Sequence, residues 1–232
     1  MARVRRKRNV EVVEAERGGN RAMWLGGILV LLLLAVAAIV MIGRGDGETA
    51  VDAELYEGIP VEGTVLGDPD APVLIREIID FKCPHCATAA ERLVPDIIEN
   101  YVAEGQVRMA FIPVDFLGDQ SLMSAQAAYC AAEQDAFMEY HDVLFANHRN
   151  TFNITNLTNY AERVGLDTQQ FRACLTTGEY RNQVIQENRT LASQLGATST
   201  PTFVVNDTLV AGAVPFEQMQ AVIEQELETV EE

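Results

Sequence analysis

The residues with the most distinctive chemistry are the four of Cys83-Pro84-His85-Cys86. Two cysteines with this spacing at the start of a helix can close a small disulfide ring. The free N–H groups and the macrodipole at a helix N-terminus favour an anion, so we expect Cys83 to be a thiolate near neutral pH. Pro84 suits the first helical turn because it has no N–H to lose, and His85 adds a hydrogen-bond donor or a positive charge beside the sulfur. Because these features stabilise the reduced form, they predict a strongly oxidising disulfide.

The elements that hold this motif in place are predicted to form a βαβ unit. Residues 73–80 are a short apolar run that ends at a turn, which is typical of a strand. Residues 86–104 are predicted to be a helix that Pro95 kinks, and residues 107–114 are predicted to be a second strand. Two parallel strands joined through one helix have a right-handed crossover.

The second half of the chain begins with a block that is almost entirely helical in pattern, at about residues 121–195. Breaks within the block are predicted at Gln134-Asp135, 147–153, 165–167 and Gly178. A hairpin of two strands and a final helix follow the block, at residues 203–205, 209–211 and 216–228. The predicted fold class is therefore α/β, in the order βαβ, inserted helical block, ββα.

The motif and these elements together resemble the DsbA family of thiol–disulfide oxidoreductases, which have a thioredoxin-like fold with a helical insertion. The matching stretches are VLGDPDAPVLI (65–75), DFKCPHC (80–86), AYCAAEQDAFMEYHDVLFANH (128–148), FRACL (171–175) and GATSTPTFVVN (196–206). The resemblance covers about Val61 to Glu228, and it predicts one domain from 58 to 232. The Pro-His dipeptide between the cysteines is associated with the oxidising members of the family.

The resemblance also implies a role for each residue of the site. Cys83 is expected to be the exposed nucleophile that forms mixed disulfides, and Cys86 the buried resolving thiol. Thr200-Pro201 falls where the family has a cis-proline loop packed against the active disulfide. This loop would present the backbone of Thr200 to an extended substrate segment.

Glu77 is a candidate proton carrier, because it lies six residues before Cys83 on the predicted strand. Thioredoxin-fold proteins often keep a buried acid at this place, and it could take the proton from Cys86 as the disulfide exchanges. The alternative is a carboxylate in solvent on an edge strand. We favour the proton relay because alternation puts Glu77 on the same face as Ile75 and Ile79.

The remaining two cysteines, Cys130 and Cys174, lie in two helices of the inserted block. Their apolar neighbours indicate buried faces, and some members of the family have a second bridge, so we favour a structural disulfide in an oxidising compartment. A loop of 44 residues (174 − 130) would stabilise the fold by roughly 4 kcal/mol in the chain-entropy model. The alternatives are two separate buried thiols or a relay of electrons to the active pair.

The sequence predicts no metal and no organic cofactor. A structural zinc site needs two close ligand pairs, whereas Cys130 and Cys174 are far apart. His141 and His148 are seven residues apart on one predicted helix, but no set of carboxylate ligands accompanies them. We expect these histidines to lie at the helix surface or to cap helices.

The N-terminal part of the chain has a different character. Residues 1–22 carry seven Arg/Lys and three Glu, a net charge of +4, so the total of −17 leaves −21 for the rest. That acidity argues against nucleic acid as a partner, despite the basic run 3–8.

Residues 23–42 are an apolar run long enough to span a membrane, and the positive-inside rule places residues 1–22 in the cytoplasm. The alternative is a cleaved signal peptide, and residues 43–57 are expected to be a flexible linker.

These features together predict a membrane-anchored enzyme that oxidises protein thiols outside the cytoplasm. Its substrates would be reduced secreted or membrane proteins. The family resemblance implies reoxidation by a quinone-linked membrane oxidase of the DsbB or vitamin K epoxide reductase type. A tethered reductase, an isomerase and a non-redox chaperone or binding module are the alternative functions.

Overall fold

The computed structural model describes residues 53–231, which form a mixed sheet with helices on both faces. The six strands are β1 (Val61–Glu62), β2 (Val65–Leu66), β3 (Val73–Ile79), β4 (Val107–Pro113), β5 (Thr202–Val205) and β6 (Thr208–Ala211). The α-helices are α2 (Pro84–Arg92), α3 (Val94–Ile97), α4 (Asp119–Ala132), α5 (Phe137–Ala146), α6 (Ile154–Arg163), α7 (Thr168–Thr177), α8 (Arg189–Gln194) and α9 (Phe216–Glu231). A 3₁₀ helix η1 (Ala53–Tyr56) and two π-helical segments, η2 (Ile98–Val102) and η3 (Gln183–Asn188), complete the list.

The sheet has the strand order β1-β2-β4-β3-β5-β6. β3 pairs parallel with β4 and antiparallel with β5, so the strand that leads into the cysteine motif is central. Apolar side chains of β3 point to both faces, as expected for a strand with neighbours on both sides, and Arg76 and Glu77 are its two charged residues. The α/β class and the order βαβ, helical block, ββα are confirmed.

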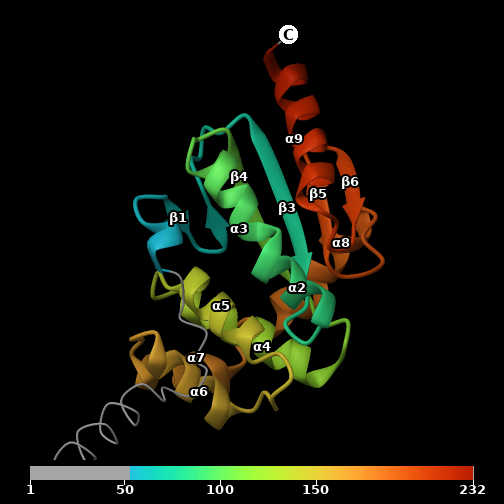
Figure 1. Cartoon of the computed structure of the whole chain (residues 1–232). Helices are drawn as coiled ribbons and strands as arrows, with labels where there is room; N and C mark the ends of the chain where they lie inside the picture. The colour runs from blue at the N-terminus through green and yellow to red at the C-terminus, as the bar shows by residue number, and fades with distance from the viewer. Residues whose placement is uncertain (1–52, 232) are drawn as a thin grey trace, which may run out of the picture. The chain divides into compact units, whose positions relative to one another are not determined.

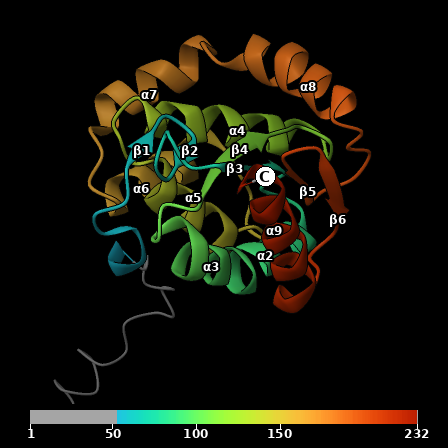
Figure 2. The ribbon, with the colours of Figure 1, turned by 90° about the horizontal axis from the view of Figure 1, so that it is seen from above.

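Helices cover the two faces of the sheet in different ways (Figure 1, Figure 2). α2, α3 and α9 lie on one face, where the main core contains Ile75, Phe111 and Cys86. α8 lies over the other face, where a smaller core joins Ile78 to Ala192. The two faces together bury most of β3, with Leu74 and Arg76 partly exposed.

The helical block spans α4 to α8, and its breaks fall where the sequence predicts them. Side chains begin two of these helices, since Asn153 accepts the backbone N–H of Asn156 and Asp167 accepts those of Gln169 and Gln170. Gly178 ends α7 in the left-handed conformation that glycine adopts easily. These local signals explain why the block could be divided correctly from sequence.

The helix after the cysteine motif differs from the prediction at 86–104. It begins two residues earlier, at Pro84, because Cys83 serves as its N-terminal flanking residue. It is also broken after Arg92, since Pro95 has no N–H to donate back into the preceding turn. α3 and the π-helical η2 continue the path to Gly105, which has a positive φ of 71°.

The N-terminal edge of the described region adds two features that the prediction lacks. β1 and β2 form a short hairpin that extends the sheet beyond β4. Within the expected linker 43–57, η1 packs its Leu55 and Tyr56 against the core, and the Tyr56 hydroxyl donates to Asp142 Oδ2 at 2.8 Å.

No helix within residues 53–231 has the length and apolar character needed to cross a membrane. The expected membrane helix at 23–42 and the segment 1–22 lie outside the described residues.

Candidate active site

The cysteine motif lies where β3 ends and α2 begins. A turn follows the strand, in which the backbone N–H of Cys83 donates to the carbonyl of Asp80 at 2.9 Å. Pro84 then occupies the first turn of α2, as predicted. The result is that the Cys83 sulfur lies at the open N-terminal end of a helix, facing the backbone N–H groups of the first turn.

Cys83 has the electrostatics of a nucleophilic thiol. Its pKa is lowered from the ordinary 9.0 to about 5. The largest cause is a hydrogen bond from the Cys86 thiol, and burial opposes it. The side chain of Thr200 and the backbone N–H groups of Cys86 and His85 lower the pKa further. Cys83 is 6 % exposed, so it is accessible only in comparison with Cys86. The expectation of an exposed nucleophile is therefore wrong, because Cys83 is buried against the neighbouring elements.

Cys86 has the opposite electrostatics although it lies three residues away. It is fully buried, and burial is the first cause that raises its pKa well above the ordinary value. The hydrogen bond with Cys83 and the negative charges of Cys83 and Glu77 raise it further. One turn of helix thus holds one thiol that ionises easily and one that retains its proton.

Glu77 is a buried carboxyl group near Cys86. It is 1 % exposed on the central strand, which excludes the alternative of a solvated edge carboxylate. Burial raises its pKa from 4.5 to about 8, and its Oε2 has no hydrogen-bond partner among the described residues. A group that titrates near neutral pH beside a buried thiol is suited to exchange a proton with it.

Thr200-Pro201 lies against the cysteines. The peptide bond between these two residues is cis, and the Cys83 thiol donates to the carbonyl oxygen of Thr200 at 3.3 Å. Cys83 and Thr200, which are 117 positions apart in the sequence, are therefore in contact at the site.

His85 contributes to the site through its backbone. Its side chain is exposed, whereas its backbone N–H is one of the groups that lower the pKa of Cys83. The structure thus shows a main-chain hydrogen bond from His85 to the sulfur, and a hydrogen bond or charge from its side chain stays a prediction.

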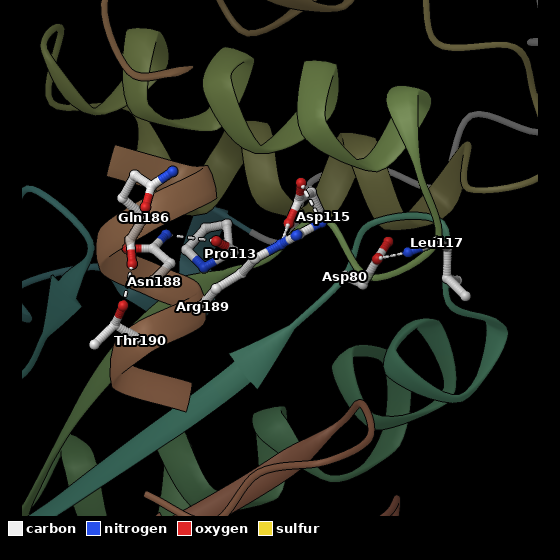
Figure 3. Close-up of polar contacts among 8 residues, drawn as sticks. All are labelled: Asp80, Pro113, Asp115, Leu117, Gln186, Asn188, Arg189 and Thr190. Carbon is white, nitrogen blue, oxygen red and sulfur yellow. Dashed lines mark hydrogen bonds and ion pairs between the residues drawn. The ribbon is translucent and has the colours of Figure 1, made fainter. Parts of the chain in front are cut away.

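Two residues of the site were absent from the prediction. Asp80 is fully buried and accepts the backbone N–H of Leu117, which lies 37 residues away (Figure 3). The Lys82 ammonium donates to the carbonyls of His148 and Asn150 at 2.6 and 2.8 Å, which ties the turn before Cys83 to the helical block. The sequence signal for both was only their place within DFKCPHC.

The other candidate residues lie away from this site. Cys130 of α4 and Cys174 of α7 form a disulfide with an S–S distance of 2.00 Å, as predicted. His148 is at the end of α5, where its Nδ1 contacts the carbonyl of Phe145 at 2.8 Å. The surface position expected for His141 is wrong, because aromatic rings surround it and it is 1 % exposed.

A sheet of this topology with a dithiol at the start of its first long helix and a cis-proline loop beside it defines a thioredoxin-fold disulfide-exchange protein. A family model described as thioredoxin matches residues 60–225. The chain belongs to this thioredoxin family and is a DsbA-like protein thiol–disulfide oxidoreductase.

Known proteins agree with that assignment. The probable disulfide bond formation protein D of Bacillus cereus is 31 % identical over 217 residues, which are 90 % of this chain and 98 % of that protein. The crystal structure of oxidised BdbD from Bacillus subtilis has a TM-score of 0.66 and 27 % identity, and covers 74 % of this chain and 97 % of that one. DsbA of Chlamydia trachomatis has a TM-score of 0.64 and 25 % identity, over 70 % and 90 % of the two chains.

A second kind of relative is longer. The Na(+)/H(+) antiporter NhaA 3 of Salinispora tropica is 34 % identical over 216 residues, which are 92 % of this chain. The match spans about a third of the antiporter's own length (32 %).

Proposed function

We propose that the chain is an oxidase of protein thiols that works outside the cytoplasm. The observation that carries this proposal is that the pKa values of the two cysteines are shifted in opposite directions. The pKa of Cys83 is lowered to about 5, and that of Cys86 is raised. A stabilised thiolate favours the reduced pair, so the disulfide form gives up its bond readily. The Pro-His dipeptide between the cysteines supports the same direction of exchange.

In the proposed reaction a substrate thiolate attacks the Sγ of Cys83 in the Cys83–Cys86 disulfide. The bond between the two sulfurs breaks, and Cys86 leaves as a thiolate that takes the proton of Glu77. A second substrate thiolate then attacks the substrate sulfur of the mixed disulfide. Cys83 leaves as a stable thiolate, and the substrate departs with a new disulfide.

The substrate-binding role falls to Thr200 and Pro201. The Thr200 carbonyl lies 3.3 Å from the Cys83 sulfur, so an extended segment bonded to Cys83 would run beside the backbone of this loop. We propose reduced secreted or membrane proteins as substrates. The exchange needs no metal or organic cofactor.

The reduced enzyme must pass two electrons and two protons to a further oxidant. We propose a quinone-linked membrane oxidase of the DsbB or vitamin K epoxide reductase type as that partner. The apolar run 23–42 supports a single-pass anchor with the catalytic domain on the outer side.

The redox equilibrium of the full chain with glutathione tests the proposed direction, with Cys130 and Cys174 followed separately by mass spectrometry. An oxidase is expected to have a potential of about −120 mV. A potential of about −270 mV would make the chain a tethered reductase instead.

A further inference from the structure

A polar pocket that the disulfide exchange does not use lies between the end of α5 and α6. Its volume is about 530 Å³, and four asparagines, a threonine, a tyrosine and two arginines line it. The arginines are Arg149 and Arg163, so we call it the arginine pocket. None of the described side chains that line it is acidic, although the chain outside residues 1–22 has a net charge of −21. The pocket is therefore a local positive site on an acidic domain.

Hydrogen bonds within the wall fix the shape of the arginine pocket. The side-chain amide of Asn150 donates to Asn147 Oδ1 at 2.9 Å and to the Tyr160 hydroxyl at 3.3 Å. The side-chain amide of Asn156 donates to the carbonyl of Thr151 at 2.8 Å. Because these groups are already held in place, a ligand would bind without first having to order the wall.

The wall of the arginine pocket is also attached to the turn that carries the nucleophile. Lys82 directly precedes Cys83, and its ammonium donates to the carbonyls of His148 and Asn150 at 2.6 and 2.8 Å. Asn150 thus belongs both to the pocket wall and to the anchor of the catalytic turn. A substrate chain bonded to Cys83 would therefore start one residue away from the side chain that reaches the pocket.

The groups that face the arginine pocket suit a carboxylate. The guanidinium of Arg149 is exposed and has no hydrogen-bond or ion-pair partner within residues 53–231. The guanidinium of Arg163 lies 5.4 Å from the centroid of the Tyr160 ring, which keeps this cation at the pocket wall. A guanidinium presents parallel N–H groups that match the two oxygens of a carboxylate. The side chains of Asp and Glu supply that group in a protein substrate.

We propose that the arginine pocket is a substrate subsite, which binds an Asp or Glu side chain near the cysteine that reacts with Cys83. The proposal rests on the proposed function in taking protein thiols as substrates, and it adds the class of segment that the enzyme prefers. At about 0.15 M salt, charges more than about 8 Å apart are largely screened. The two arginines therefore determine the potential inside the pocket, in spite of the acidic surface around it.

The test compares two peptides that share one cysteine and carry either Glu or Gln two to five residues away from it. The oxidised full chain reacts with each peptide at about 0.15 M salt, and acid quenching with mass spectrometry follows the mixed disulfide. The measured quantity is the ratio of the Glu-peptide rate to the Gln-peptide rate, because a change in this ratio between variants cancels the peptides' own thiol reactivity. In Arg149→Gln/Arg163→Gln we expect the ratio to fall about fivefold, with the Gln-peptide rate unchanged.

Arg172→Gln is the matched control. It makes the same change of charge at an exposed arginine of α7 that does not line the pocket, so it should keep the wild-type ratio. A wild-type ratio in the double variant overturns the proposal. An equal fall in Arg172→Gln also overturns it, because net charge alone would then explain the preference. If circular dichroism shows that the double variant does not fold, Arg149→Gln carries the decision.

A titration by nuclear magnetic resonance separates the pocket from the proposed function. A Glu peptide without cysteine is added to the ¹⁵N-labelled full chain, and the Nε–H signals of Arg149 and Arg163 are followed. Shifts of these signals that the Gln peptide does not cause support the subsite, and their absence overturns it. If the wild type oxidised neither cysteine peptide, the proposed oxidase function would fail, while this titration, which needs no thiol, would still decide the pocket.

Discussion

The two cysteine pairs of this domain are equally shielded from solvent, yet the groups that surround their sulfur atoms differ. Cys83 and Cys174 are each 6 % exposed. Cys83 faces backbone N–H groups at the start of α2 and lies three residues from its partner, whereas Cys174 is bonded to Cys130, 44 positions away on another helix. Burial therefore does not distinguish the reactive pair from the structural pair. The two pairs differ instead in the polar groups around each sulfur and in the length of chain between the partners.

Loss of the nucleophile should have the largest effect. In Cys83→Ser, a hydroxyl that cannot form a disulfide replaces the thiolate, so the rate of oxidation of a reduced protein should fall by at least about 1000-fold. The assay is recovery of activity by a reduced, disulfide-dependent substrate protein. Client folding that survived this change would favour the non-redox chaperone function.

Removal of the structural pair should affect stability and leave the chemistry in place. In Cys130→Ala/Cys174→Ala, the free energy of unfolding should fall by about 4 kcal/mol, because a 44-residue loop no longer restricts the unfolded chain. Urea unfolding measures this loss, and the oxidation rate of the folded variant should stay within about twofold of wild type. A large loss of rate in a folded variant would instead show that this pair relays electrons.

Glu77→Gln should give a smaller and pH-dependent effect. The carboxyl has a pKa of about 8 in the folded chain and 4.5 ordinarily, so the folded state binds its proton more tightly and loses stability as the pH rises from 4.5 through 8. The variant does not titrate there, so it should equal wild type below pH 4.5 and be more stable by about 3 kcal/mol at pH 7.

The exchange rate supplies the second readout for Glu77. Without a proton carrier for Cys86, we expect Glu77→Gln to slow the release of Cys86 by about tenfold or more. Urea unfolding of the reduced protein across this pH range and stopped-flow mixing with a reduced peptide measure the two effects. A variant whose stability follows the wild-type pH dependence and whose rate is unchanged would remove Glu77 from the mechanism.

The parts of the fold that could be predicted are those with strong local signals. The apolar run of β3, the helix breaks at Asn153, Asp167 and Gly178, and the spacing of Cys83 and Cys86 are each signals within a few residues. The hairpin of β1 and β2 was missed because two-residue strands are too short to show a period.

The missed features of the site depend on contacts between distant parts of the chain. Asp80 accepts a hydrogen bond from the N–H of Leu117, and a pattern of residue types along the sequence does not predict that contact. His141 was misplaced because its helix packs rings of other elements, including Phe81 and Phe111, around it. Glu77 was placed correctly because the alternation of β3 already pointed it to the core.

The order of the four cysteines along the chain also bears on how the protein is made. Four cysteines allow three pairings, and in the one with Cys83–Cys86 and Cys130–Cys174 the two loops do not overlap. The first two cysteines leave the ribosome together and can join before either of the others is synthesised. Proximity along the chain therefore favours the pairing in which Cys83 joins Cys86 and leaves Cys130 to Cys174.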